Sequence, residues 1–384
     1  FRSYIIDDVN DNLLKEDIYL SETADDDELS VLFVESGGSE EEFLKIEDKI
    51  TDPCIIITTY KNNSYPASLE IKSYLSTKYK TAFILDATDE TQLSLIIAQI
   101  AKVFKAKQEL NGSRLGVIGK PSDWLIYSKS DYSKINEKLG VSLIDIPMEE
   151  LKEEIDKHQY GRVRHISEIK KKWDKPEVLE CALSIYGALK RIIIRYNLEG
   201  LTVRCFDLLG LYKNTSCLAF SLLNEEGYIA TCEGDVPSMI TMLVANKLTG
   251  YSSFQANPSY VDFKECKILF AHCTVPLDMA KSFELDTHFE SGLGIGVRGE
   301  LPTGDVIVAK IGADLESFLL IQGKIIDNPK LTGYCRTQIM VQFDRREFMD
   351  FFSSDVGNHM IICYDSNPAM FAACFDLLLK PTQK

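Results

Sequence analysis

The sequence predicts an α/β fold of two Rossmann-like α/β domains, residues 1–110 and 111–251, followed by an antiparallel, β-rich, barrel-like C-terminal domain, residues 252–384. Two observations support this prediction. Up to residue 251, short apolar runs alternate with helical patterns, which is typical of parallel strands covered by helices. From residue 252, short apolar runs are separated by turn residues, and few helical patterns lie between them. A length of 384 residues suits two or three domains.

The first domain is predicted from three buried strands and the helices between them. The strands are Ser30–Glu35, Cys54–Thr59 and Thr81–Leu85. The helices are Ser39–Lys49, Tyr65–Thr77 and Glu90–Leu110. Such a succession predicts a parallel sheet with helices on its faces.

The second domain repeats the alternation with longer helices. Its predicted strands are Leu115–Gly119, Val141–Ile146, Leu201–Phe206 and Tyr228–Cys232. Its predicted helices are Met148–Asp156, Pro176–Tyr196, Thr215–Leu223 and Val236–Leu248. The last helix has Pro237 in its first turn and Gly250 just beyond its end, the usual start and stop signals.

The third domain is predicted to consist mainly of strands. They are Lys267–Val275, Gly294–Arg298, Val306–Ile311, Phe318–Ile321, Lys324–Ile326, Cys335–Phe343 and His359–Tyr364. Pro302–Asp305 and Gln322–Gly323 are predicted turns. The motif Gly292-x-Gly294-x-Gly296 is predicted to be a closely packed strand and not a phosphate loop, because no helical pattern follows it.

Composition excludes several classes of partner. The net charge is −16, of which residues 1–50 carry −12, so we interpret that region as a solvated acidic face. Nucleic acid is not expected as a partner, because phosphate binding needs clustered cationic side chains and the short basic stretch Lys170–Lys172 is interpreted as a solvated helix face. No apolar run approaches the ~20 residues that cross a bilayer, so no membrane partner is expected.

The cysteines predict a cytoplasmic protein. None of the ten cysteines forms a CxxC pair, and most lie in apolar runs, so they are expected to be reduced and buried. The sequence opens at Phe1 without a basic stretch and an apolar stretch behind it. A signal peptide is therefore either lacking or already removed.

The sharpest local feature is the run Cys232-Glu233-Gly234-Asp235-Val236-Pro237, where a predicted strand ends and a helix begins. Ligands of α/β proteins collect at the carboxyl ends of strands. Asp235 is placed to cap the following helix. Glu233 has no such duty, which makes it a candidate for metal coordination or proton transfer.

Three of the five histidines lie in the β-rich domain. His272 sits inside an apolar strand, His359 starts another, and His288 lies in a loop. A histidine in an apolar strand is commonly a satisfied core residue, and that interpretation stays open. Two such histidines together with Glu233 nevertheless allow a divalent metal site.

The stretch Tyr228–Gly250 resembles the active-site segment of L-fucose isomerase-like proteins, and L-arabinose isomerases carry a similar Glu-Gly-Asp. Further segments follow in the family's order. They are Gly119–Ser128, Phe254–Ser259, Ala271–Cys273, Thr287–Gly292, Cys335–Gln338 and Asn358–His359. The resemblance spans most of the chain and implies two α/β domains before a β-rich one.

The resemblance also implies a Mn²⁺-type site and aldose–ketose interconversion through an ene-diol. Glu233 matches the glutamate that binds metal and shuttles a proton, and His359 and His272 match metal or active-site histidines. The remaining acidic ligand falls at Asn257, which we assign to the metal and catalytic set. Asparagine can offer one carbonyl oxygen to a hard cation, but it cannot act as a base.

Family architecture implies a homo-oligomer whose N-terminal domain covers the sugar site of a neighbouring subunit. The residues expected to bind the sugar are Trp124, Tyr60, Asn62, Asn63, His288 and Glu290. Loop structure or core packing is the alternative for Trp124 and for the residues around Tyr60.

Three functions remain open from the sequence. The leading one is a metal-dependent aldose–ketose isomerase of fucose-like or arabinose-like sugars. A catalytically impaired sugar-binding paralogue is the main alternative, and Asn257 favours it. The third is a related metal-dependent enzyme acting on another polyol or on a modified sugar.

Overall fold

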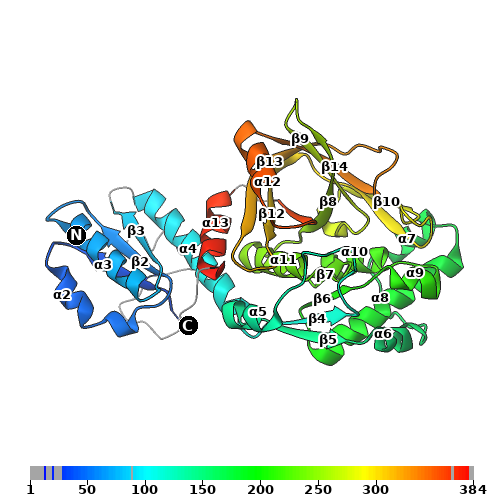
Figure 1. Ribbon diagram of the computed structural model, residues 1–384, viewed down its shortest axis with the longest axis horizontal. Helices are drawn as coiled ribbons and strands as arrows, with labels where there is room; N and C mark the ends of the chain where they lie inside the picture. Colours follow the sequence, from blue (N-terminus) through cyan, green and yellow to red (C-terminus); the bar gives the residue numbers. More distant parts are fainter. Residues whose placement is uncertain (1–12, 14–19, 21–27, 88–89, 365–366, 380–384) are drawn as a thin grey trace. The chain divides into compact units, whose positions relative to one another are not determined.

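The computed structural model describes residues 13, 20, 28–87, 90–364 and 367–379 (Figure 1). They divide into two compact units. The first unit holds the described residues up to Gln108 with those from Asp376 on, and the second is Glu109–Phe375. The predicted α/β class, with parallel sheets and an antiparallel strand-rich region, is confirmed. The division into three domains stays a prediction.

The first unit is built on a parallel sheet in the order β1-β2-β3. Its strands are β1 (Ser30–Val34), β2 (Cys54–Thr58) and β3 (Ala82–Asp86). Its helices are α2 (Ser39–Leu44), η2 (Glu47–Lys49), α3 (Ser64–Thr77) and α4 (Glu90–Leu110). Strand β2 is buried throughout: Ile55 packs in a cluster with Ile97 of α4, and Ile56 packs in another with Ile71 of α3. Burial on both faces explains its continuous apolar run.

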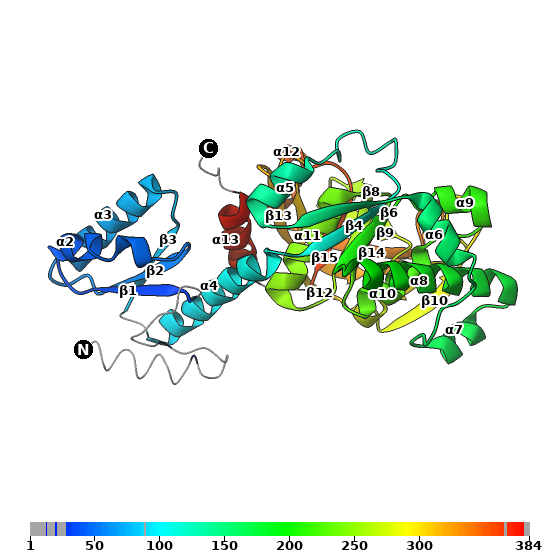
Figure 2. The same cartoon turned by 90° about the horizontal axis from the view of Figure 1, so that it is seen from below.

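The second unit contains a four-stranded parallel sheet in the order β5-β4-β6-β7. Its strands are β4 (Arg114–Ile118), β5 (Ser142–Ile146), β6 (Gly200–Val203) and β7 (Ile229–Cys232). The helices of this part are α5 (Tyr132–Leu139), α6 (Met148–Ile155), α7 (Ile166–Lys172), α8 (Pro176–Tyr196), α9 (Asp207–Tyr212), α10 (Cys217–Glu225) and α11 (Val236–Thr249). Helix α8 packs against α6 and α10 (Figure 2).

An antiparallel barrel follows in the same unit, closed in the order β12-β13-β14-β9-β8-β15. Its strands are β8 (Phe254–Asp262), β9 (Lys267–His272), β12 (Gly304–Ile311), β13 (Phe318–Asp327), β14 (Thr337–Phe343) and β15 (Met360–Cys363). The remaining elements are η3 (Leu277–Met279), the antiparallel pair β10 (Ser282–Asp286) and β11 (Gly296–Glu300), α12 (Arg345–Ser353) and α13 (Pro368–Leu379).

Helix α11 joins the sheet to the barrel. It packs against β6 and β7 of the sheet and against β12 and β15 of the barrel, and Figure 1 shows it between the two. One cluster of buried apolar side chains also continues from Val203 in the sheet to Val308 in the barrel. The start of α11, directly after Glu233, therefore lies where sheet and barrel meet.

Two sequence-based predictions about glycines need correction. The predicted turn at Gln322–Gly323 is wrong, because β13 runs through it. A Cβ on Gly323 would lie 2.6 Å from Phe343, so this glycine admits a neighbouring ring within the barrel. The strand predicted from Gly294 begins only at Gly296; Gly294 has a φ of 60°, and its backbone approaches Thr215 closely.

The chain carries no described helix that is both long enough and apolar enough to span a membrane.

Candidate functional site

The site forms where three parallel strands end side by side. Val203 at the end of β6 is in register with Ile118 of β4 and with Cys232 of β7. The loops that follow therefore start at one edge of the sheet. They carry Trp124, Cys205 with Phe206, and Glu233.

Glu233 occupies a strained turn. Its φ is 67° and that of Gly234 is 72°, both in the left-handed region. For a residue with a Cβ this conformation costs about 1–3 kcal/mol, a cost that recurs at functional sites. The turn is fixed by neighbours: Ser122 donates its N–H to the Glu233 carbonyl at 2.8 Å, and a Cβ on Gly234 would lie 2.7 Å from the Lys120 carbonyl oxygen.

The Glu233 carboxylate faces two nitrogen groups. Trp124 donates its Nε1–H to Oε2 at 2.5 Å, and Nε2 of His359 lies 3.6 Å from Oε1. Burial by itself raises the pKa of Glu233, but His359, Trp124 and His272 together outweigh it and lower the pKa. The carboxylate is therefore ionised at neutral pH.

His359 is completely buried and is held by Asp235. Its Nδ1 lies 2.8 Å from Asp235 Oδ2, and its own φ is 63°. Burial works to lower the pKa of His359, but the hydrogen bond to Asp235 and the negative charges of Asp235 and Glu233 raise it to about 9. Among the described residues, Nε2 of His359 has no hydrogen-bond partner, although it is buried and close to Glu233. Buried polar nitrogens are normally hydrogen-bonded, so this one is open to a water, an ion or a ligand.

Asp235 has more than the predicted capping role. The cap is confirmed, since its carboxylate accepts the Ser238 N–H at 2.9 Å at the start of α11. It also forms a fully buried ion pair with Lys310 of β12, Nζ to Oδ2 3.2 Å. Lys310 was not predicted from the sequence; its signal is a single cation inside the apolar strand Val306–Ile311.

His272 lies close to Glu233 and lines the same cavity. It ends β9, its Nδ1 lies 2.9 Å from Thr274 Oγ1, and its ring centroid lies 5.5 Å from that of His359. Burial, followed by the nearby charge of His359, lowers the pKa of His272 to about 3. The ring is therefore neutral, the state in which imidazole binds metals. Ligand atoms of His272, Glu233 and Cys232 lie within 4.8 Å of one another.

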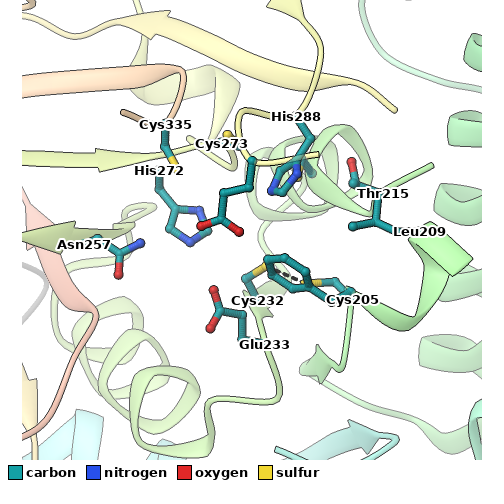
Figure 3. Close-up of a pocket in the computed structure, with 13 residues that line it drawn as sticks. Cys205, Leu209, Thr215, Cys232, Glu233, Asn257, His272, Cys273, His288 and Cys335 are labelled. Carbon is teal, nitrogen blue, oxygen red and sulfur yellow. Dashed lines mark hydrogen bonds between the residues drawn. The ribbon is translucent and has the colours of Figure 1, made fainter. Parts of the chain in front are cut away.

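These groups share one small cavity with further predicted residues (Figure 3). Its lining is Cys205, Phe206, Leu209, Thr215, Cys217, Cys232, Glu233, Asn257, His272, Cys273, His288, Glu290 and Cys335. Figure 3 shows Asn257, His272 and Glu233 around the same space. Asn257, in β8, accepts the Asn358 side-chain N–H at 2.6 Å through its Oδ1.

Trp124 and His288 both contact the ring of Phe206. Phe206 meets the Trp124 ring edge-on with centroids 4.9 Å apart and the His288 ring at 5.5 Å. Burial is the main cause that lowers the pKa of His288. Glu290 is a second carboxyl group in the lining of the cavity. Partial burial and the charge of Glu233 raise its pKa.

Tyr60, Asn62 and Asn63 belong to the first unit, in the turn between β2 and α3. All three have left-handed backbones, with φ of 55°, 51° and 59°. The Asn62 carbonyl accepts the N–H of Gly37 at 2.8 Å, which gives this turn a structural role. Their predicted contact with a sugar across a subunit interface stays a prediction.

A divalent cation fits the donor set of this cavity. The neutral ring of His272 would supply one nitrogen, and Nε2 of His359 would supply a second once the cation has displaced its proton. Glu233 would supply a carboxylate oxygen, and Asn257 an amide oxygen. Mixed oxygen and imidazole donors suit Mn²⁺ and similar divalent ions.

Comparison with known proteins shows that this chain is distantly similar in sequence to sugar isomerases. No protein-family model matches it. It is 20% identical to the sulfoquinovose isomerase of Alkalicoccus urumqiensis over 279 residues, which are 66% of this chain and 60% of that protein. The sulfoquinovose isomerase of Priestia aryabhattai is 20% identical over 261 residues, 64% of this chain and 58% of that protein.

A third sulfoquinovose isomerase, from Clostridium sp. (strain MSTE9), is 25% identical over 167 residues, 41% of this chain and 37% of that protein. The chain thus spans 60% or less of the length of these curated relatives. What the comparisons establish is a distant similarity to sugar isomerases.

Proposed function

We propose that this protein is an aldose–ketose isomerase whose active site is the cavity at Glu233. The observation that carries the proposal is an ionised carboxylate in a strained turn, facing two buried imidazoles at the edge of a small cavity. The similarity to sulfoquinovose isomerases supports the reaction class.

Glu233 is the group that moves the proton. An ionised carboxylate can accept a proton from the carbon beside a sugar carbonyl and return it to the neighbouring carbon, through an ene-diol. The Trp124 N–H and the fixed turn hold this carboxylate in one place. Positioning of this kind is what a proton transfer between adjacent carbons needs.

Asp235 and Lys310 act through His359. The buried ion pair between them keeps Asp235 charged, and Asp235 directs Nε2 of His359 toward Glu233. Glu233, His272, His359 and Asn257 would hold a Mn²⁺ ion or another divalent cation. When bound, such an ion would supply a Lewis acid that polarises the sugar carbonyl.

Asn257 supports a second candidate, a sugar-binding paralogue with little turnover. Its amide cannot act as a base, and its Oδ1 is already engaged by Asn358. Glu290 favours the enzyme, because it brings a second carboxyl group to the lining of the same cavity. Its raised pKa suits a group that gives and takes protons.

The relatives' names suggest a modified sugar as substrate, with sulfoquinovose as one member of that class. The described residues that line the cavity include no lysine or arginine. A sulfonate group would therefore find no cationic side chain in that lining. The substrate screen should contain neutral and sulfonated sugars alike.

The test uses the purified full chain with Mn²⁺ and a panel of pentoses, 6-deoxyhexoses and sulfoquinovose. We expect the protein to form a ketose from at least one aldose of the panel. Sugar binding without ketose formation from any sugar of the panel would instead favour the binding paralogue. Calorimetry with each sugar separates the two functions.

A further inference from the structure

The cavity is unusually rich in sulfur. Of the ten cysteines in the chain, five line it in the described structure. They are Cys205, Cys217, Cys232, Cys273 and Cys335. A sugar and a hard cation make no use of thiols, so the proposed isomerase function leaves these side chains unexplained.

Two of the thiols are in direct contact beside Glu233. The Sγ atoms of Cys205 and Cys232 lie 2.8 Å apart, and both side chains are buried. Cys232 ends β7, and Cys205 follows the neighbouring strand β6 by two residues. Parallel pairing of these strands therefore brings the two sulfurs together.

The same sulfur belongs to a group that could surround a metal ion. The Sγ of Cys232, a carboxylate oxygen of Glu233 and a ring nitrogen of His272 lie within 4.8 Å of one another. With Cys205 in contact with Cys232, the set consists of two sulfurs, one nitrogen and one oxygen. Zn²⁺ takes these donor types in four-coordinate, tetrahedral sites.

We propose that Cys205, Cys232, His272 and Glu233 form a binding site for a thiophilic divalent cation such as Zn²⁺. With zinc–sulfur bonds of about 2.3 Å, two tetrahedral sulfur ligands lie about 3.8 Å apart. The pair must therefore open by about 1 Å on binding. Cys205 lies in the turn after β6, outside the paired strand. The cation displaces the thiol protons to solvent.

This site overlaps with the one proposed for the sugar's cation. Glu233 and His272 belong to both donor sets, so a thiophilic ion and Mn²⁺ compete for the cavity. That competition rests on the proposed function, whereas thiolate coordination itself does not require any turnover. Cys232 and Cys205 are the side chains that separate the two binding modes.

The test is a Co²⁺ titration of the full, reduced chain, with Co²⁺ as the spectroscopic substitute for Zn²⁺. We expect a near-ultraviolet thiolate-to-cobalt charge-transfer band that Zn²⁺ removes by displacement. Cys232→Ser should abolish the band and weaken Zn²⁺ binding at least about tenfold while leaving Mn²⁺ binding unchanged, since only the soft donor is lost. Cys205→Ser should weaken the band, and Cys335→Ser, another thiol of the same cavity, should leave it intact.

Cobalt bound without a charge-transfer band, or a band that survives Cys232→Ser, would overturn the proposal. Should Cys232→Ser fail to fold, X-ray absorption of the zinc-loaded wild type decides. Sulfur at about 2.3 Å from zinc is the expected result, and a shell of nitrogen and oxygen alone contradicts it. None of these measurements uses a sugar, so a failed isomerase assay leaves their outcome unaffected.

Discussion

Asp235 and His359, 124 residues apart in the chain, are joined by a 2.8 Å hydrogen bond between two fully buried side chains. The bond links the start of α11 to the residue directly before β15, and thus the parallel sheet to the barrel. On its far side, His359 points Nε2 toward Glu233. The candidate active site is therefore held by the same contact that joins these two parts of the fold.

Asp235→Asn should strongly destabilise the second unit. The variant keeps the shape of the side chain but leaves the Lys310 ammonium buried without its anionic partner. Breaking one side of a buried ion pair costs about 3–5 kcal/mol. Urea unfolding of the variant measures this loss.

Lys310→Met provides the control for that experiment. Lys310→Met removes the cation but keeps the Asp235–His359 bond, and it should also lower the free energy of unfolding. The double variant Asp235→Asn with Lys310→Met should lose less stability than the sum of the two single variants. Fully additive losses would show that the two side chains are not coupled.

Glu154, which lies outside the cavity, should make the folding stability depend on pH. Burial alone raises its pKa, but hydrogen bonds from Arg191, Lys157 and Arg195 outweigh burial and lower the pKa to about 2. Because the pKa of Glu154 is lower in the folded state, its ionised carboxylate stabilises the fold at pH values above 4.5, the pKa in the unfolded chain. This stabilisation is lost as the pH falls through the folded-state pKa. Glu154→Gln should therefore cost about 3 kcal/mol at pH 7.

Urea unfolding of wild type and Glu154→Gln between about pH 2 and about pH 7 measures this effect, because that range covers the pKa of Glu154 in both the folded and the unfolded state. The stability difference between the two proteins should shrink as the pH falls below 4.5. Glu316→Gln is a matched control, because its ion pair with Lys134 is solvent-exposed. An equal difference at all pH values would contradict the role given to Glu154.

Asn257→Asp should strengthen binding of Mn²⁺. The change adds a carboxylate to a cavity that already holds Glu233, and its Oδ1 can keep the hydrogen bond from Asn358. A second anionic oxygen beside a divalent cation should raise its affinity by about tenfold or more. Isothermal titration with Mn²⁺ measures the change; equal affinity in the two proteins would place the cation away from Asn257.

Much of the fold could be predicted from apolar periodicity. Both ends of the helices Glu90–Leu110 and Pro176–Tyr196 are confirmed, because long amphipathic patterns have clear limits. Strand β8 was missed, since Phe254–Asp262 contains Asn257 and Pro258 and shows no apolar run. Its place in the barrel depends on pairing with β15, Ala256 to Met360, which no local pattern reveals.

The candidate site could be predicted in part. Glu233 was identified by its position after a strand, and His272 and His359 by standing in apolar strands. The structure brings these three side chains together. Lys310 and Cys205 were missed because their importance comes from contacts with Asp235 and Cys232, which only strand register creates.

Glu233→Gln is the most direct test of the proposed function. The amide keeps the size of the side chain but cannot accept the substrate proton. With Mn²⁺ and the best sugar of the panel, the variant should form ketose about 10²–10⁴-fold more slowly than wild type while still binding the sugar. Equal ketose formation by the two proteins would contradict the role of Glu233 and, with it, the proposed mechanism.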